Sequence, residues 1–263
     1  VAGTSACITA PCASRVFVLL RYHTNGSLDT SFGSGGAVTT SFFVANIATS
    51  IDVAPDGKIV LAGWTDRGCL ACSSFLIARY NPDGTPDTGF GVGGVVKTDF
   101  GSIVTGISRA SAVVIREGTL QQKIVVGGFF QDRAICGNAS GEIFPCDFAL
   151  ARYNEDGSLD TSFGDGGHAI TGVGPSDDYA KAMAIQPDGK VVVAGWGYGA
   201  NSDVMQLVRW QRDGGLDASF GNGGRVLLDL GARAAQANAV ALQADGKLLV
   251  AGSVDPAGQG KQI

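Results

Sequence analysis

Hydrophobic residues fall in short runs that are separated by turn-forming residues. The run from Phe75 to Tyr80 is nearly continuous, as expected of a strand buried on both faces. An Asn-Gly or Asp-Gly pair, a strong signal for a tight turn, follows this run and its three counterparts. Further apolar segments span 37–42, 51–54 and 58–64, the last two around Pro-Asp-Gly. The pattern predicts short antiparallel strands and no amphipathic helix.

This order of segments occurs four times, which makes an internal repeat the main organising feature of the chain. The first phrase is RYHTNGSLDTSFGSGG at 21–36, and it recurs as RYNPDGTPDTGFGVGG at 79–94, RYNEDGSLDTSFGDGG at 152–167 and RWQRDGGLDASFGNGG at 209–224. The second phrase is SIDVAPDGKIVLAGW at 50–64, and it returns in a degenerate form at 112–129 and more faithfully at 182–196 and 239–253. Each repeat therefore contains the same predicted strands.

Four short antiparallel strands per repeat fit the blade of a β-propeller. We therefore predict an all-β chain that forms one propeller domain or segment over residues 1–263. Its four complete repeats span approximately 13–70, 71–144, 145–202 and 203–263. The N-terminal stretch at 1–12 matches the end of a fourth strand and its loop, which predicts a leftover strand. We expect a segment of a longer propeller, and the alternative is a small closed ring whose terminal strands meet.

The consensus RYNxDGxLDxSFGxGG followed by QPDGKxxVAGW resembles the bacterial delta-60 repeat family. The resemblance covers nearly the whole chain and departs only in the second repeat, where Pro-Asp-Gly-Lys is lost and the hairpin is longer. It implies a β-propeller that is secreted or attached to the cell surface. It implies no activity, because the repeat of this family has none assigned.

Composition narrows the classes of function. The 263 residues carry a net charge of −5, with 19 Lys and Arg and no basic run. Because nucleic-acid affinity depends on neutralising phosphates, we expect no nucleic-acid partner. No apolar run reaches the length of about eighteen residues that would suggest a membrane-spanning helix. The 40 glycines fit many short strands joined by tight turns.

The six cysteines form three local pairs, one in each of three equivalent connections between the predicted blades: Cys7 and Cys12, Cys69 and Cys72, and Cys136 and Cys146. This arrangement predicts three loop-closing disulfides. Disulfides persist in oxidising compartments, so we expect a secreted, periplasmic or cell-surface protein. The rival interpretation is metal or redox chemistry at the CxxC of 69–72, but no histidine partner lies near it in the sequence.

Residues that recur in every repeat are expected to build the scaffold. We predict that Arg21, Arg79, Arg152 and Arg209 pair with Asp29, Asp87, Asp160 and Asp217, and that the phenylalanines at 32, 90, 163 and 220 pack between blades. The turn NEDGSLD at 154–160 has part of a calcium-loop pattern. It lacks an acid at the first and twelfth ligand positions, so side-chain-stabilised turns are favoured over calcium. No other cofactor is expected.

The connections at one end of the blades vary in length and composition, while those at the other end are nearly identical. Variable loops on a rigid scaffold are a usual place for binding residues. The candidates for ligand binding at the variable end are Trp64, Asp66, Arg67, Asp132, Arg133, Asp177, Asp178, Tyr179, Trp196 and Tyr198. The two tryptophans share a repeat position, so packing between blades is their alternative role.

No recognisable catalytic motif occurs, and neither His23 nor His168 has a nucleophile or metal ligand near it in the sequence. We therefore expect a non-enzymatic extracellular module that binds a glycan or a protein or acts as a structural scaffold. One alternative is a secreted metal-dependent hydrolase with its site on the variable end or in the central channel, and Asp177 and Asp178 would be its first suspects. The other is a self-assembling surface or filament component that uses exposed terminal strands.

Overall fold

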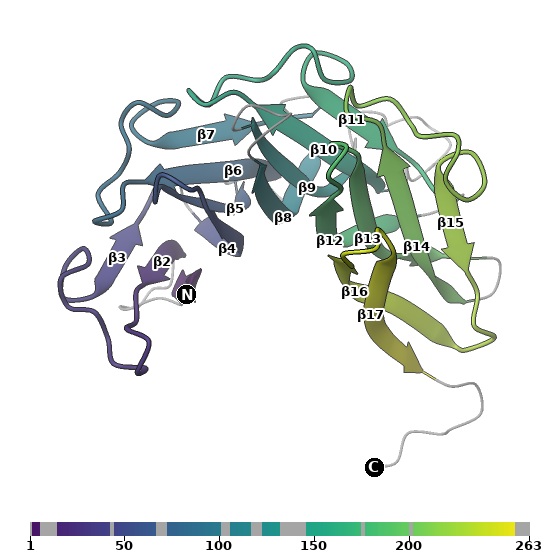
Figure 1. The fold of residues 1–263 in the computed structure, drawn as a ribbon, viewed down its shortest axis with the longest axis horizontal. Helices are drawn as coiled ribbons and strands as arrows, with labels where there is room; N and C mark the ends of the chain where they lie inside the picture. Colours follow the sequence, from purple (N-terminus) through teal and green to yellow (C-terminus); the bar gives the residue numbers. More distant parts are fainter. Residues whose placement is uncertain are drawn as a thin grey trace, which may run out of the picture. The chain divides into compact units, whose positions relative to one another are not determined.

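The structure is a computed structural model, and it describes residues 2–5, 15–42, 45–66, 73–100, 106–116, 123–131, 146–174, 177–199 and 202–255. The regular elements within these residues are β-strands joined by turns (Figure 1). The described residues contain no helix of the length and hydrophobicity that crossing a membrane requires. The chain is all-β, as the alternation of apolar runs and turn residues predicts.

The chain divides into two compact units. Unit 1 comprises residues 1–126 and 152–160, and unit 2 comprises residues 127–151 and 161–263. Unit 1 contains β1 (Ala2–Ser5), β2 (Val16–Leu20), β3 (Ala37–Thr40), β4 (Ala45–Val53), β5 (Ile59–Asp66), β6 (Ser73–Tyr80), β7 (Val95–Thr98) and β8 (Ile107–Arg116). Two further strands, β9 (Lys123–Gln131) and β10 (Asp147–Tyr153), contribute residues to both units.

In unit 1, consecutive strands pair as antiparallel meanders (Figure 1). One sheet has the order β1-β2-β3, and β4, β5, β6 and β7 follow one another in the next. The strand β8 lies beside β6 through a single parallel bridge between Ser73 and Ile107. Every residue of β6 is buried, which confirms the prediction that this apolar run is covered on both faces.

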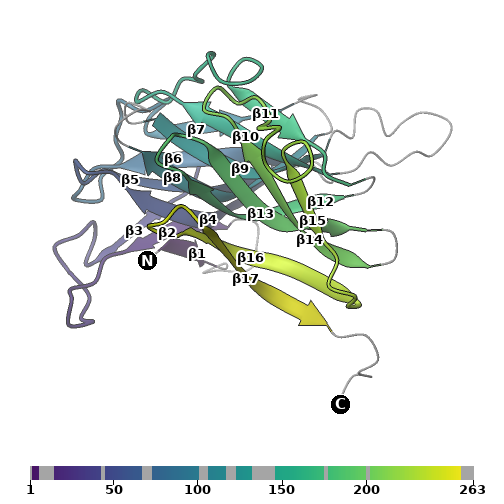
Figure 2. The same ribbon diagram turned by 45° about the vertical axis from the view of Figure 1, so that its right-hand side comes forward.

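Unit 2 repeats the arrangement with β11 (His168–Thr171), β12 (Asp178–Ile185), β13 (Val191–Tyr198), β14 (Asp203–Trp210), β15 (Arg225–Leu228), β16 (Ala234–Leu242) and β17 (Leu248–Asp255). The strands β12 to β15 form an antiparallel meander, and β16 and β17 form a hairpin (Figure 2). In this hairpin Leu249 is 56% exposed, whereas Val60 and Val192 at the same repeat position are 1% and 0% exposed. Among the described residues, nothing covers the Leu249 side of β17 as its counterparts are covered.

The sheets are out of phase with the sequence repeats. The meander β4-β5-β6-β7 joins the hairpin that ends one repeat to the Arg-Tyr strand that begins the next, because β5 pairs with β6 along its full length. The connection at 67–72, which carries one cysteine pair, therefore joins neighbours within a sheet. The prediction that the cysteine connections lie between blades is wrong, because the strands that flank each of them are neighbours in one sheet: β1 and β2, β5 and β6, and β9 and β10.

The recurring ionic residues form the predicted pairs. Arg79 donates from Nε to Asp87 Oδ2 at 2.7 Å, and the same bond joins Arg21 to Asp29, Arg152 to Asp160 and Arg209 to Asp217. A lysine from the preceding hairpin joins three of these pairs: Lys58 to Asp87, Lys123 to Asp160 and Lys190 to Asp217, at 3.1 to 3.3 Å. The degenerate second repeat keeps this lysine although its turn sequence is lost.

The recurring phenylalanines and glycines join successive repeats. Phe32 lies against Gly84 of the next repeat, where a Cβ atom would come within about 3 Å of its ring. The Gly33 amide donates to the Asp83 carbonyl at 2.9 Å, and the Gly91 amide donates to that of Asp156 at 2.8 Å. Within unit 1, these contacts confirm the predicted packing of the phenylalanines against a neighbouring repeat.

The turn considered for calcium is held by its own side chains. Asp156 Oδ1 accepts hydrogen bonds from the Ser158 amide at 2.9 Å and from the Ser158 hydroxyl at 2.6 Å. The amide group of Asn154 donates to the Ser158 hydroxyl at 2.9 Å. These bonds confirm the side-chain-stabilised turn.

Candidate functional site

Acidic and aromatic side chains of the third repeat converge in unit 2. Asp178 and Tyr179 begin β12, and Trp196 and Tyr198 end β13. The two strands pair so that Tyr179 lies opposite Trp196 and Asp178 lies opposite Gly197. With Asp177, which directly precedes β12, these residues are five of the predicted ligand-binding residues, and the pairing of the two strands brings them together. We call these five residues, together with Phe129, Asp147 and Gln206, the acidic–aromatic cluster.

Four aromatic rings form one side of the acidic–aromatic cluster. The Tyr179 and Trp196 rings stack, with centroids 4.7 Å apart and planes at 29°. Phe129 meets Tyr179 edge-on at 5.2 Å, and Tyr198 meets Trp196 edge-on at 5.8 Å. Pairs at these separations stabilise each other beyond their buried area. Tyr198 is 45% exposed, so the aromatic group reaches the solvent.

Two of the three carboxylates hold backbone in place. Asp177 Oδ1 accepts a hydrogen bond from the Cys146 amide at 2.8 Å, and its Oδ2 accepts one from the Tyr179 hydroxyl at 3.1 Å. Asp178 is fully buried, and its Oδ2 accepts hydrogen bonds from the Val173 and Gly174 amides at 2.6 and 3.3 Å. These bonds fix the chain on either side of the cluster, which orients its side chains.

Other polar atoms of the cluster have no hydrogen-bond partner in the described part of the chain. They are Asp178 Oδ1, Gln206 Oε1 and Nε2, and Trp196 Nε1. Gln206 is fully buried, and its Nε2 lies beside Asp178 Oδ1 over Gly197, where a Cβ atom would clash with both atoms. Buried polar atoms are nearly always hydrogen-bonded, so each unpaired one calls for an explanation.

Among the described residues, the carboxylates of this cluster have no positively charged partner. Within the described residues, no arginine, lysine or histidine pairs with Asp147, Asp177 or Asp178. The scaffold aspartates differ, since Asp87 and Asp217 each contact an arginine and a lysine. Uncompensated carboxylates in a half-buried setting repel one another and attract cations.

Internal comparison separates the cluster from the scaffold. Asp147 lies five residues before the repeat arginine, where the other copies have Val16, Ser74 and Val204. Gln206 lies three residues before it, where the other copies have Val18, Leu76 and Ala149. Asp147 and Gln206 occur once, at positions that the fold fills with apolar or small residues. Neither residue is among those predicted from the sequence, although a polar residue in an otherwise apolar strand could have indicated them.

The ionisation of the cluster follows from its burial. Burial, together with the neighbouring Asp178 and Asp177, raises the pKa of the Asp147 carboxyl to about 6. Burial also raises the pKa of Asp178, against the effect of its backbone hydrogen bonds. The pKa of the Cys146 thiol is raised to about 12 by burial and by the charge of Asp177. At neutral pH the thiol is therefore protonated.

Replacing Asp147 by asparagine is expected to stabilise the protein at pH 7. Because the pKa of Asp147 rises from 3.8 to about 6 on folding, the folded state binds more protons than the unfolded state between these values. Stability therefore falls as the pH rises through this window, and an uncharged side chain at this position would remove that loss. The expected gain is about 1 kcal/mol after solvent screening is allowed for.

Chemical denaturation of both proteins at pH 7 and at pH 3.5 measures this effect. The gain of Asp147→Asn should be present at pH 7 and absent at pH 3.5, where the carboxyl is largely protonated in both states. Asp188→Asn is the matched control, since Asp188 lies in an exposed turn and should change little. A variant that is less stable than the parent at pH 7 would show that Asp147 supports the fold.

The remaining candidates lie in unit 1 or outside the described residues. In unit 1, the Arg109 guanidinium lies over the Trp64 ring at 4.2 Å from its centroid, and Asp66 ends β5. Arg67, Asp132 and Arg133 lie outside the described residues, as do Cys7, Cys12, Cys69, Cys72 and Cys136. The structure has Cys146 as a buried free thiol. Because its predicted partner Cys136 and the other four cysteines lie outside the described residues, the three disulfides stay predictions.

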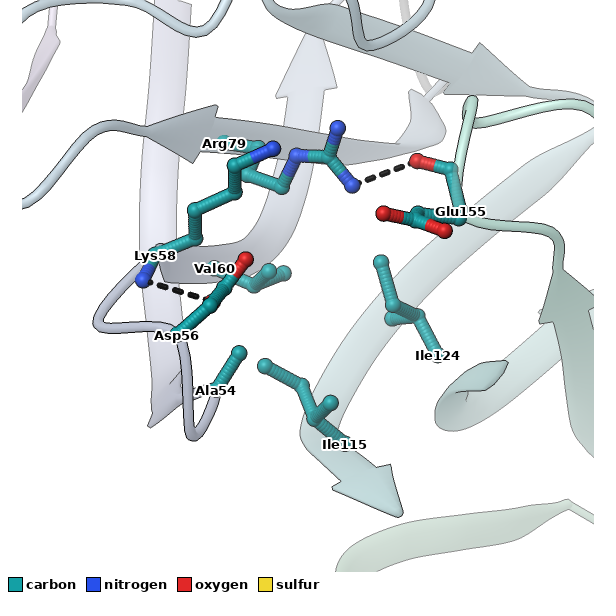
Figure 3. Close-up of a pocket in the computed structure, with 8 residues that line it drawn as sticks. All are labelled: Ala54, Asp56, Lys58, Val60, Arg79, Ile115, Ile124 and Glu155. Atoms are coloured by element: carbon teal, nitrogen blue, oxygen red, sulfur yellow. Dashed lines mark hydrogen bonds between the residues drawn. The ribbon is translucent and has the colours of Figure 1, made fainter. Parts of the chain in front are cut away.

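Two hollows in unit 1 offer no comparable chemistry. The first, drawn in Figure 3, is lined by Ala54, Asp56, Lys58, Val60, Arg79, Ile115, Ile124 and Glu155, and its volume of about 20 Å³ has room for roughly one water molecule. The second, of about 550 Å³, is open and lined by turn residues such as Gly91 and Gly157 that every repeat shares. In the described part of the chain, no group of three or more His, Cys, Asp or Glu is arranged to hold a metal ion.

Comparison with known proteins agrees with the fold. Residues 13–32, 54–90, 146–163 and 186–220 match the family model described as a domain of unknown function (DUF5122) beta-propeller. The four matched segments coincide with the recurring sequence phrases, which supports a β-propeller repeat family. No curated protein matches the chain.

Proposed function

We propose that this chain is a non-enzymatic binding module built from four-stranded β-propeller blades of the delta-60 type, with its ligand site at the acidic–aromatic cluster. The proposal rests on one observation above all. Polar side chains that occur once in the repeats, such as Asp147 and Gln206, come together with aromatic rings in unit 2, and several polar atoms of this group have no hydrogen-bond partner among the described residues. Functional residues are expected to break the local rules of a fold in this way.

The cluster is suited to binding and not to turnover. Its aromatic rings offer flat apolar surfaces, and its carboxylates accept hydrogen bonds from hydroxyl, ammonium or guanidinium donors. Asp177 and Asp178 are partly occupied by backbone donors, so they pre-organise the surface. Pre-organisation lowers the entropy lost when a ligand binds. The predicted disulfides would serve the same purpose in an oxidising compartment outside the cytoplasm.

Titration with defined probes tests the proposed function. The probes are uncharged oligosaccharides and tetrapeptides that carry arginine, lysine or glutamate, and tryptophan fluorescence follows their binding. At least one probe should bind, and it should remain chemically unchanged by mass spectrometry. Replacing Trp196 by alanine should weaken that binding about tenfold or more, since stacking on aromatic rings contributes of the order of 1 kcal/mol or more per contact.

Trp64→Ala is the matched control, because Trp64 holds the same position in the first repeat and is already covered by Arg109. It should leave probe binding unchanged. Tyr198→Ala provides a second variant at an exposed residue, so the test does not depend on the folding of the Trp196 variant. Equal loss of binding in the Trp64 and Trp196 variants, or no probe binding at millimolar concentration, would overturn the proposal.

A further inference from the structure

The acidic–aromatic cluster has the chemistry of a receptor for a planar organic cation. Asp147 forms no hydrogen bond or ion pair with any described residue, so both of its oxygens are available. Asp178 Oδ1 is a further acceptor that receives no hydrogen bond from the described residues. A guanidinium group donates five N–H bonds in a fixed fork and matches carboxylate oxygens in pairs.

The unpaired amide of Gln206 supports a ligand site independently of the acidic residues. It is fully buried and replaces an apolar residue of the other repeats. Burial raises the pKa of Asp178, and the nearby Gln206 amide lowers it. The geometry between the two side chains does not reach that of a hydrogen bond. Such a side chain is costly to leave without hydrogen bonds. Its place next to a free carboxylate oxygen favours a ligand that brings several donors into the same space.

The chain itself shows how a guanidinium fits an equivalent position. In unit 1, Arg109 of the following repeat places its guanidinium 4.2 Å from the centroid of Trp64. Trp196 holds the same strand position as Trp64, but no described cation lies over its ring. In the repeat that follows Trp196, the uncharged Gln236 takes the position of Arg109. Among the described residues, the cation that covers Trp64 thus has no counterpart where the carboxylates gather.

A divalent metal ion fits the cluster less well. In the described part of the chain, no three carboxylate, thiol or imidazole side chains are arranged to hold one. Both oxygens of Asp177 and one oxygen of Asp178 are occupied by protein donors. Aromatic rings beside carboxylates instead provide cation–π and bidentate contacts, which are available to an arginine side chain.

We propose that the acidic–aromatic cluster binds an exposed arginine side chain of a partner protein, with Asp147 and Asp178 Oδ1 accepting its N–H groups and the aromatic wall of Trp196 and Tyr198 contacting its face. The inference rests on the proposed function and identifies its ligand class. It assigns a binding role to Asp147, a residue that the fold does not need, because the other repeats have Val16, Ser74 and Val204 at this position.

Calorimetric titration with three capped tripeptides tests this inference. The peptides are Gly-Arg-Gly, Gly-Lys-Gly and Gly-citrulline-Gly, the last being an uncharged analogue of the first. The arginine peptide should bind at least tenfold more tightly than the citrulline peptide, and its affinity should fall as salt is added. The lysine peptide should bind more weakly than the arginine peptide, because an ammonium lacks the planar fork.

Asp147→Asn should weaken binding of the arginine peptide about tenfold, and Asp188→Asn at an exposed turn should not change it. Equal binding of the arginine and citrulline peptides, or unchanged binding to Asp147→Asn, would overturn the inference. If an uncharged oligosaccharide binds in a Trp196-dependent way and no arginine peptide does, the inference fails while the proposed function stands. If neither binds, both fail.

Discussion

Replacing Asp87 by alanine is expected to lower the free energy of unfolding by about 3–5 kcal/mol, because it leaves a buried positive charge without its partner. The Arg79 side chain is only 7% exposed, and its Nε lies 2.7 Å from Asp87 Oδ2. Lys58 contacts the same oxygen at 3.1 Å. After the substitution, the Arg79 guanidinium would keep the hydrogen bond to the Glu155 carbonyl that Figure 3 shows, which does not neutralise it.

Urea denaturation at several pH values measures this effect. Burial acts to raise the pKa of Asp87, but Lys58 and Arg79 hold it below its usual value of 3.8. The stabilisation is therefore complete above pH 3.8 and is lost as the pH falls through the lower pKa of the folded state. Asp29→Ala is the comparison, since Arg21 is 39% exposed and no lysine of the described residues joins that pair. Equal losses in the two variants would contradict the account.

Replacing Gly195 by alanine is expected to destabilise the protein by about 3 kcal/mol, the upper end of the usual effect of overpacking. A Cβ atom at Gly195 would clash with the Tyr179 carbonyl oxygen. This contact lies at the bulge where the register of β12 against β13 shifts between Ala180 and Ala182. The backbone of Tyr179 would have to move, so the stacking of Tyr179 on Trp196 should be lost together with stability.

Thermal denaturation and near-ultraviolet circular dichroism report the two consequences of Gly195→Ala. The melting temperature should fall, and the aromatic signal of the folded state should change. Gly215→Ser is the control, because it introduces the residue that Ser27 and Ser158 supply at the same place in other repeats. It should be neutral or slightly stabilising. An unchanged melting temperature for Gly195→Ala would show that the two strands pack less closely than the structure has them.

The repeat made most of the scaffold predictable from the sequence. The Arg–Asp pairs could be predicted because the same two residues recur at a constant spacing in all four copies. The buried strand at 73–80 could be predicted from its continuous apolar run. The grouping of strands into sheets could not, because a repeat has no intrinsic starting point and only hydrogen bonding decides which neighbours share a sheet.

The candidate site was predicted in part. Asp177, Asp178 and Tyr179 are adjacent in the sequence, and the variable end of the repeats directed attention to them. Their proximity to Trp196 depends on the register of β12 against β13, which the sequence does not specify. Asp147 and Gln206 lie on other strands, far from Asp178 in the sequence. Gln206 approaches Asp178 only because Gly197 has no side chain between them, a relation that spacing along the chain cannot show.

The melting temperature of Asp147→Asn, measured with and without the arginine tripeptide, tests most directly that the cluster serves binding and not folding. At pH 7 the variant alone should melt above the parent protein, because an unfavourable half-buried charge has been removed. The peptide should raise the melting temperature of the parent, since a ligand of the folded state stabilises it. It should raise that of the variant much less. A variant that melts below the parent, or that responds equally to the peptide, would contradict the account.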